Sequence, residues 1–201
     1  IGDHSGATMA LRDALKRGWM SGHRIVDAGR PVVPTYGHGD SRINVFGVAV
    51  SDEFRVAIDS EGVCDGADEC RKAARQQLGR GADVLKIVTT GLSSKPIGPD
   101  RGAQMTPEEI KAVIDTAHMQ GKKVAAHAHG GIGLTSALEA GIDSIEHGTL
   151  MTDSDIALFA KSRAYYVPTL ATVTNYLDRL KNPNLSASDR AVVEARLSKV
   201  G

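Results

Sequence analysis

The 201-residue sequence has no excess of either charge, because 24 lysines and arginines balance 24 aspartates and glutamates. A net charge of zero gives no electrostatic basis for binding nucleic acid or an anionic membrane. No uncharged apolar run approaches the roughly 20 residues that a membrane-spanning helix needs. We therefore expect a protein with no nucleic-acid partner and no membrane partner.

Cysteine is scarce. Cys64 and Cys70 lie six residues apart in one helix-like stretch and lack Cys-x-x-Cys spacing, so we predict two free thiols rather than a disulfide. The chain opens with Ile1-Gly2-Asp3-His4, which has neither an initiator methionine nor a signal-peptide pattern. The sequence leaves the compartment open between the cytoplasm and the periplasm or secretion.

Short β-branched runs alternate with amphipathic helical stretches, which indicates βα units and a parallel sheet. Five runs have strand character, and each follows a helix: residues 23–28, 83–88, 123–127, 143–147 and 165–170. A barrel and a doubly wound sheet both fit, but no glycine-rich phosphate loop follows any of the runs, which weighs against a nucleotide-binding sheet. Five units are too few to close an eight-stranded barrel of about 250 residues, so either the fold is open or the chain is incomplete.

The clearest helix begins at Thr106-Pro107-Glu108-Glu109. Thr106 and Glu109 form a predicted capping box, Pro107 suits the first turn, and Gly121 is placed to end the helix. After Asn175 the sequence changes character, and residues 187–199 predict a polar helix on the surface or in a lid.

Three successive strand candidates carry unusual side chains near their ends: Lys86, then His127 and His129, then His147. A buried ammonium must pair, lose its proton or be modified. Neighbouring strand ends lie about 5 Å apart, so we expect these side chains to converge. Imidazoles bind zinc-like cations, and a neutral lysine can react with carbon dioxide to give a carbamate that bridges two cations. A lone histidine more often packs or hydrogen-bonds, and a strand lysine more often faces solvent, but their joint spacing favours a metal site.

These motifs resemble strands four, five and six of the amidohydrolase superfamily: Val84-Leu85-Lys86-Ile87, then residues 124–130, then Ser144-Ile145-Glu146-His147-Gly148. The branch most similar to them holds imidazolonepropionase-like proteins, Xaa-Pro dipeptidases, Xaa-Arg/Lys carboxypeptidases and ochratoxin-degrading amidohydrolases. Residues 11–14, 37–40 and 167–170 are also typical of it. The resemblance covers nearly the whole chain and implies an α/β fold, a (β/α)₈ TIM-type barrel of which roughly strands three to seven are present.

The resemblance also implies roles for individual residues. Lys86 would be N6-carboxylated and would bridge two divalent metal ions, expected to be zinc, with His127 and His147 holding the second metal. His129 would act as a catalytic residue that polarises the scissile carbonyl or positions the substrate. His38, in a loop after an earlier strand, would contact a substrate carboxylate.

Two family features are missing from this sequence: the His-x-His of the first strand, which holds the first metal, and the aspartate after the eighth strand. The family's small β-sandwich domain is missing as well. We therefore expect a fragment, with residues 1–174 forming a partial metal-dependent hydrolase barrel and residues 175–201 forming a polar helical extension or lid of the same domain.

For the intact protein the resemblance implies hydrolysis of an amide or peptide bond by metal-activated hydroxide. The substrate would be a small molecule, such as a dipeptide or an N-acyl amino acid with a free C-terminal carboxylate, and we expect a homo-oligomer. Two alternatives remain. One is a cyclic-amide hydrolase of the imidazolonepropionase type, against which Lys86 argues because that reaction usually uses one metal. The other is an inactive barrel that serves as a binding scaffold.

Overall fold

The computed structural model describes residues 3, 6–40, 62–91 and 102–198. Its helices and strands, in chain order, are α1 (Ala7–Lys16), α3 (Ala67–Gly79), β1 (Leu85–Val88), α4 (Pro107–Met119), β2 (Val124–Ala128), α5 (Gly131–Glu139), β3 (Ser144–His147), α6 (Asp153–Lys161), β4 (Tyr165–Val167), α7 (Ala171–Leu180) and α8 (Ala187–Leu197).

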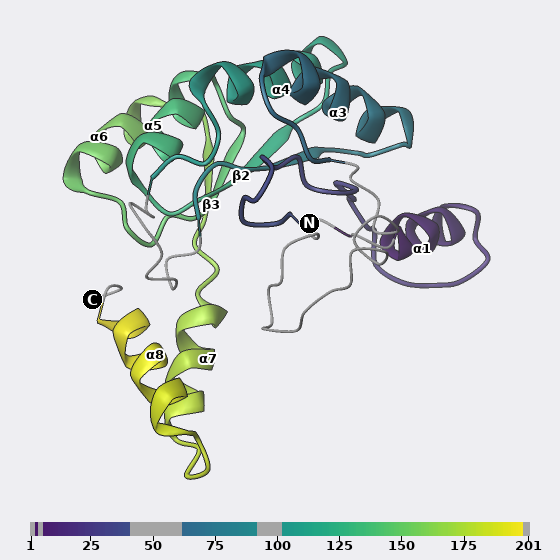
Figure 1. The fold of residues 1–201 in the computed structure, drawn as a ribbon. Helices are drawn as coiled ribbons and strands as arrows, with labels where there is room; N and C mark the ends of the chain where they lie inside the picture. The colour runs from purple at the N-terminus through teal and green to yellow at the C-terminus, as the bar shows by residue number, and fades with distance from the viewer. Residues whose placement is uncertain (1–2, 4–5, 41–61, 92–101, 199–201) are drawn as a thin grey trace.

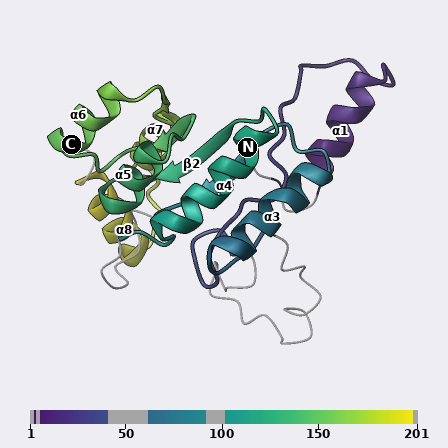
Figure 2. The same ribbon diagram turned by 90° about the horizontal axis from the view of Figure 1, so that it is seen from above.

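The four strands form one sheet in the order β1-β2-β3-β4, and each neighbouring pair is parallel. Figures 1 and 2 show α3, α4, α5 and α6 side by side over one face of this sheet. Along the chain, α3 precedes β1, α4 precedes β2, α5 precedes β3 and α6 precedes β4, so one αβ unit is repeated four times. The predicted α/β class with a parallel sheet is confirmed.

Local sequence signals set the helix boundaries. Thr106 and Glu109 form the predicted capping box at the start of α4, with each side chain bonded to the other's backbone N–H. Thr152 and Asp155 make the same reciprocal bonds at the start of α6. After α4 the chain turns at Gly121, whose φ of 66° lies in the left-handed region that glycine adopts without steric cost. The predicted end of α4 is therefore confirmed.

The hydrophobic core lies between the sheet and its helices. Alternate strand residues point to opposite faces of a sheet, and Leu85, Ile87, Ala126 and Ile145 belong to the core cluster shared with the helices. The residues between them, such as Lys86, are also buried, but on the opposite face. Because that face holds charged and polar groups, it is the place where chemistry can be carried out.

The predicted strand over residues 23–28 is wrong. That segment is irregular, and pairing with β1 begins later, where Val32 bridges Ile87 in parallel. The Asp27 carboxylate accepts a hydrogen bond from the Gly29 N–H at 2.6 Å, which is an Asx turn that bends the chain away from an extended course. Ile25 and Val26 before the turn are β-branched and favour a strand. Because of the turn, pairing with β1 occurs only later in the chain, at Val32.

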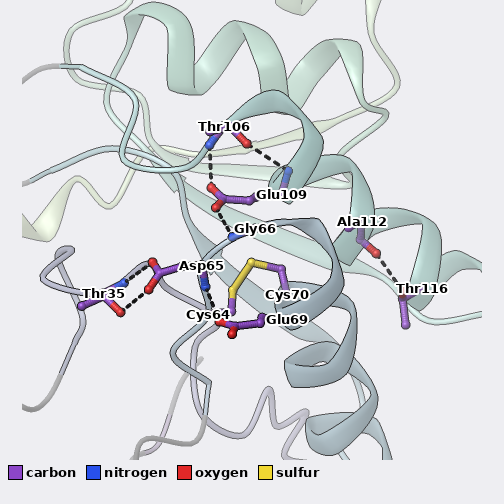
Figure 3. The surroundings of a disulfide bond; sticks show 10 residues. All are labelled: Thr35, Cys64, Asp65, Gly66, Glu69, Cys70, Thr106, Glu109, Ala112 and Thr116. Atoms are coloured by element: carbon purple, nitrogen blue, oxygen red, sulfur yellow. Dashed lines mark hydrogen bonds between the residues drawn. A yellow bond between two sulfur atoms is a disulfide. The ribbon is translucent and has the colours of Figure 1, made fainter.

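The prediction of two free thiols is also wrong, because Cys64 and Cys70 form a disulfide with a Cα–Cα distance of 4.9 Å (Figure 3). Residues six apart in one helix would lie about 9 Å apart along its axis. However, α3 begins only at Ala67, so Cys64 lies in the segment before the helix and the chain folds back between the two sulfurs. The spacing rule failed because it assumed that one helix held both cysteines.

The disulfide lies within a set of contacts that tie three segments together (Figure 3). The Asp65 carboxylate accepts hydrogen bonds from the Thr35 N–H at 3.1 Å and the Thr35 hydroxyl at 2.5 Å. The next residue, Gly66, donates its N–H to Glu109 at 2.6 Å. The segment before α3 is thereby fixed both to the start of α4 and to the loop that leads to His38.

Beyond β4 the chain leaves the sheet. Helices α7 and α8 pack against each other and extend away from the four helices that cover the sheet (Figure 1). Helix α8 matches the predicted polar helix, whereas α7 was not predicted and begins before the expected boundary at residue 174. The division at 174 itself remains a prediction. Within the part of the chain that the structure describes, no helix is long and apolar enough to cross a membrane.

Candidate functional site

Strand register brings one set of side chains together on the face of the sheet opposite the helices. Val88 on β1 pairs with His127 on β2, which pairs with Glu146 on β3, so these three residues form one row across the sheet. Lys86, two residues before Val88 on β1, pairs with Ala125 on β2. Because alternate residues share a face, Lys86 lies on the same face as His127 and Glu146.

Lys86 forms a buried ion pair across the sheet. Its Nζ lies 2.5 Å from Oε2 of Glu146, and the two side chains are 7% and 8% exposed. Strand β2 lies between them, and Ala125 at that position has only a methyl group, which leaves room for the lysine to reach β3. Burial lowers the pKa of Lys86, and the charge of Glu146 opposes this effect. The lysine expected to need a partner therefore has one.

Four histidine rings cluster beside this ion pair. The His127 ring lies at the centre, with centroid distances of 4.7 Å to His38, 4.7 Å to His129 and 4.6 Å to His147. The rings of His129 and His147 are 5.2 Å apart. The rings come from three places in the fold: the loop after Val32 and Val33, the end of β2, and the end of β3. The structure therefore brings all the predicted site residues into one region.

Burial lowers the pKa of three of these imidazoles and so favours their neutral form. It lowers the pKa of His127 to about 2 and that of His129 to about 4, with neighbouring histidines adding to both effects. Burial also lowers the pKa of His147, as does the positive charge of Lys86, while Glu146 opposes the shift. A neutral imidazole has a lone pair on one ring nitrogen, which is the form that binds a metal ion.

Two threonines contact the Nδ1 atoms of the histidines. The Nδ1 of His129 lies 2.7 Å from the Thr149 hydroxyl, and the Nδ1 of His147 lies 2.9 Å from the Thr169 hydroxyl. The Nε2 of His129 is buried and has no hydrogen-bond partner among the residues that the structure describes. An unsatisfied buried polar atom costs about 1–3 kcal/mol, so this nitrogen is suited to a bound ion or substrate group.

The backbone around the cluster is strained. Three non-glycine residues within the described ranges have positive φ: Tyr36 at 62°, His147 at 75° and Thr169 at 52°. Tyr36 precedes His38 by two residues, and His147 belongs to the histidine cluster. The Thr169 side chain hydrogen-bonds to His147. Such backbone conformations cost of order 1–3 kcal/mol and concentrate at functional sites. Their placement here supports a functional role for the cluster.

These residues fit part of a metal centre. Neutral imidazoles and a buried nitrogen without a partner are suitable donors for a zinc-like cation. However, no three His, Cys, Asp or Glu side chains within the described residues are placed to hold a metal ion together. The described residues therefore offer at most two imidazoles to any one metal ion, with Lys86 as a further ligand if it were carboxylated.

Three residues of this site were not predicted from the sequence. Glu146 is a charged residue in an otherwise buried strand and shares a face with Lys86 by simple alternation, so its role was accessible from the pattern. Thr149 and Thr169 follow β3 and β4, and no sequence signal distinguishes them from other threonines.

The sequence profile of the amidohydrolase family matches residues 8–199. Ochratoxinase of Aspergillus niger is 29% identical over 187 residues, which cover 87% of this chain and 38% of the ochratoxinase. A crystal structure of a Xaa-Pro dipeptidase with methionine bound in its active site superposes with a TM-score of 0.80 and 32% identity, covering 100% of this chain and 48% of that one. A prolidase in complex with N-methylphosphonate-L-proline gives a TM-score of 0.76 and 30% identity, covering 98% and 48%.

The chain thus spans less than half the length of these relatives. Over nearly all of its own length, however, it shares their sequence pattern and follows their barrel fold. The family profile and the sheet with its histidine-bearing strand ends lead to the same assignment, and the chain belongs to the amidohydrolase family.

Proposed function

We propose that the intact protein is a metal-dependent hydrolase that cleaves an amide or peptide bond in a small substrate. The observation that carries this proposal is the convergence of Lys86 with the imidazoles of His127, His129 and His147, which lie at the ends of neighbouring parallel strands. Strand ends are where barrel enzymes keep their active sites. The similarity to a Xaa-Pro dipeptidase and to a prolidase supports substrates such as dipeptides or N-acyl amino acids with a free carboxylate.

The proposed cofactor is a pair of divalent cations, with zinc favoured by the imidazole donors. His127 and His147 would hold one cation, and Lys86 would bridge both after carboxylation. When bound, such cations make water a strong nucleophile at neutral pH and polarise a carbonyl oxygen.

Carboxylation requires Lys86 to change its protonation state. Its ammonium must first release a proton, for which the Glu146 carboxylate at 2.5 Å is a nearby acceptor. The neutral amine then forms an N–C bond with carbon dioxide, and loss of a second proton leaves an anionic carbamate. The lowered pKa of Lys86, caused by its burial, favours the first of these steps.

The remaining histidines would handle the substrate. The Nε2 of His129 is buried and has no hydrogen-bond partner in the described part of the chain, so it is available to hydrogen-bond the scissile carbonyl of a bound substrate. His38 comes from a separate loop and lies against His127 on the other side of the cluster. It would contact the substrate carboxylate, which would fix the direction in which a dipeptide binds.

The proposal is tested by the metal content of the intact protein, purified in the presence of bicarbonate. We expect about two equivalents of a zinc-like metal per chain, falling sharply in Lys86→Ala. Lys111→Ala is the matched control, because Lys111 is an exposed lysine on α4 and its loss should leave the metal content unchanged.

Metal-loaded protein should hydrolyse dipeptides or N-acyl amino acids faster than their C-terminal amides. A protein that takes up no metal in any variant would rule out the hydrolase and leave a binding scaffold.

A further inference from the structure

The hydroxyl of Thr169 makes two hydrogen bonds whose directions can be worked out. It lies 2.7 Å from the Pro168 carbonyl oxygen and 2.9 Å from the Nδ1 of His147. A carbonyl can only accept, and a hydroxyl has a single proton to donate. The hydroxyl proton therefore goes to Pro168, and the oxygen must accept the second hydrogen bond from the Nδ1–H of His147.

We propose that Thr169 is a positioning residue that holds His147 in its Nδ1–H tautomer, which leaves the lone pair on Nε2 for a divalent cation. This inference rests on the proposed metal centre. Histidine ligands commonly donate their second ring N–H to a fixed acceptor, and that bond sets both the tautomer and the orientation of the ring. Thr169 is such an acceptor because its own proton is already engaged.

The two residues joined by this hydrogen bond also have unusual backbone conformations. Thr169 is β-branched and has a φ of 52°, where a β-branched residue is a genuine outlier, and His147 has a φ of 75°. The strained conformation of His147 is held by its surroundings, since the Tyr166 hydroxyl donates to its carbonyl at 2.9 Å. The hydrogen bond between Thr169 and His147 thus joins two strained residues from adjacent strand ends, and such strain concentrates at functional sites.

The neighbouring pair shows why Thr169 is singled out. Thr149 lies 2.7 Å from the Nδ1 of His129, but within the described residues no second hydrogen bond of its hydroxyl is found. The Thr149 proton can therefore point toward His129 or away from it, and the tautomer of His129 is not fixed by this contact. The Thr169 hydroxyl proton, in contrast, is already donated to the Pro168 carbonyl, so the Thr169 oxygen can only accept from His147.

The tautomer can be read directly in metal-free intact protein labelled with ¹⁵N-histidine. A two-bond ¹H–¹⁵N correlation spectrum at about pH 8 should show His147, assigned from the His147→Gln spectrum, with its proton on Nδ1. Thr169→Val keeps the β-branched shape but removes the acceptor, so the Nδ1–H pattern should be lost. Thr169→Ser should retain it. Thr174→Val, which removes an exposed hydroxyl bonded to a backbone carbonyl in α7, should leave it unchanged.

The second readout is the affinity for Zn²⁺, measured by competition with a chromophoric chelator. Loss of a histidine's fixed acceptor typically weakens metal binding 10- to 100-fold, so we expect Kd to rise by about that factor in Thr169→Val and to recover in Thr169→Ser. An Nε2–H pattern in the wild type, or a Thr169→Val variant with unchanged tautomer and Kd, would overturn the inference. A wild type with Nδ1–H that binds no Zn²⁺ would instead overturn the metal centre, so the two failures are distinguishable.

Discussion

Glu146→Gln preserves the size of the side chain but removes the charge that neutralises Lys86. At 2.5 Å, the attraction between the two charges is about 7 kcal/mol for an effective dielectric constant of 20. The glutamine oxygen can still accept a hydrogen bond from the ammonium, which retains about 1.5–3 kcal/mol. The difference predicts that metal-free protein loses about 4–5 kcal/mol of unfolding free energy, which agrees with the roughly 3–5 kcal/mol that is usual when one partner of a buried ion pair is removed.

The loss of unfolding free energy in Glu146→Gln should depend on pH, because deprotonation of Lys86 removes the unpaired buried charge. Burial lowers the pKa of this lysine, and in the wild type Glu146 opposes that effect, so removing Glu146 lowers the folded-state pKa further. Between the folded pKa and the unfolded value of about 10.4, the unfolded chain binds more protons. Stability of Glu146→Gln must then rise with pH across that window, by at most about 1.4 kcal/mol per pH unit.

Urea unfolding of metal-free protein at about pH 7, 8 and 9 measures both effects. Asp115→Asn is the matched control, because it breaks an exposed Lys111–Asp115 pair of 2.8 Å and should cost about 0.5 kcal/mol at most. A Glu146→Gln variant that is no less stable than Asp115→Asn would show that Lys86 and Glu146 are not a buried, charged pair. A penalty that stays constant from pH 7 to pH 9 would refute the proton release from Lys86.

Two further predictions concern stability. Replacing Cys64 and Cys70 together by alanine should lower the unfolding free energy by about 2.4 kcal/mol, which is the chain entropy of closing a loop of about seven residues. Dithiothreitol should shift the urea midpoint of the wild type toward that of the double variant, and two titratable thiols in the oxidised wild type would contradict the disulfide. In metal-free protein, His127 and His129 have folded-state pKa values far below 6.5, so stability should be fully present above about pH 6.5 and fall as the pH falls. Each contributes about 1.4 kcal/mol per pH unit, so the slope between pH 6 and 5 should be smaller by that amount in His127→Asn, and equal slopes would show that the ring is not buried neutral.

Features set by local chemistry were predictable from the sequence. The capping box of Thr106 and Glu109 depends on residues three apart, and the structure has both of its hydrogen bonds. The alternation of helices and strands was readable for the same reason. Because parallel strand ends must meet at one edge of the sheet, the convergence of Lys86, His127 and His147 followed from their positions in the chain before any contact was known.

Three features of the structure were not predictable from composition and periodicity. The strand expected over residues 23–28 was displaced by the turn at Asp27, whose side chain competes with strand pairing. The disulfide depended on where α3 begins, a boundary that no capping side chain marks, since Gly66 precedes the helix without a side-chain cap. The Thr169 contact with His147 requires two unusual backbone conformations, which composition and periodicity do not encode.

The ion pair and the proposed metal centre cannot coexist unchanged. Carboxylation would turn the side chain of Lys86 from a cation into an anion, and Glu146, which attracts the ammonium at 2.5 Å, would then repel it. Glu146 must therefore turn away or be offset by bound cations when the site is loaded, so the observed pairing belongs to the metal-free state. It follows that the cost of Glu146→Gln should shrink when bicarbonate and Zn²⁺ are added before unfolding, because Lys86 no longer needs a counter-charge. If the cost is the same with and without them, Lys86 keeps its ammonium in the presence of metal, and the bridging role assigned to it is wrong.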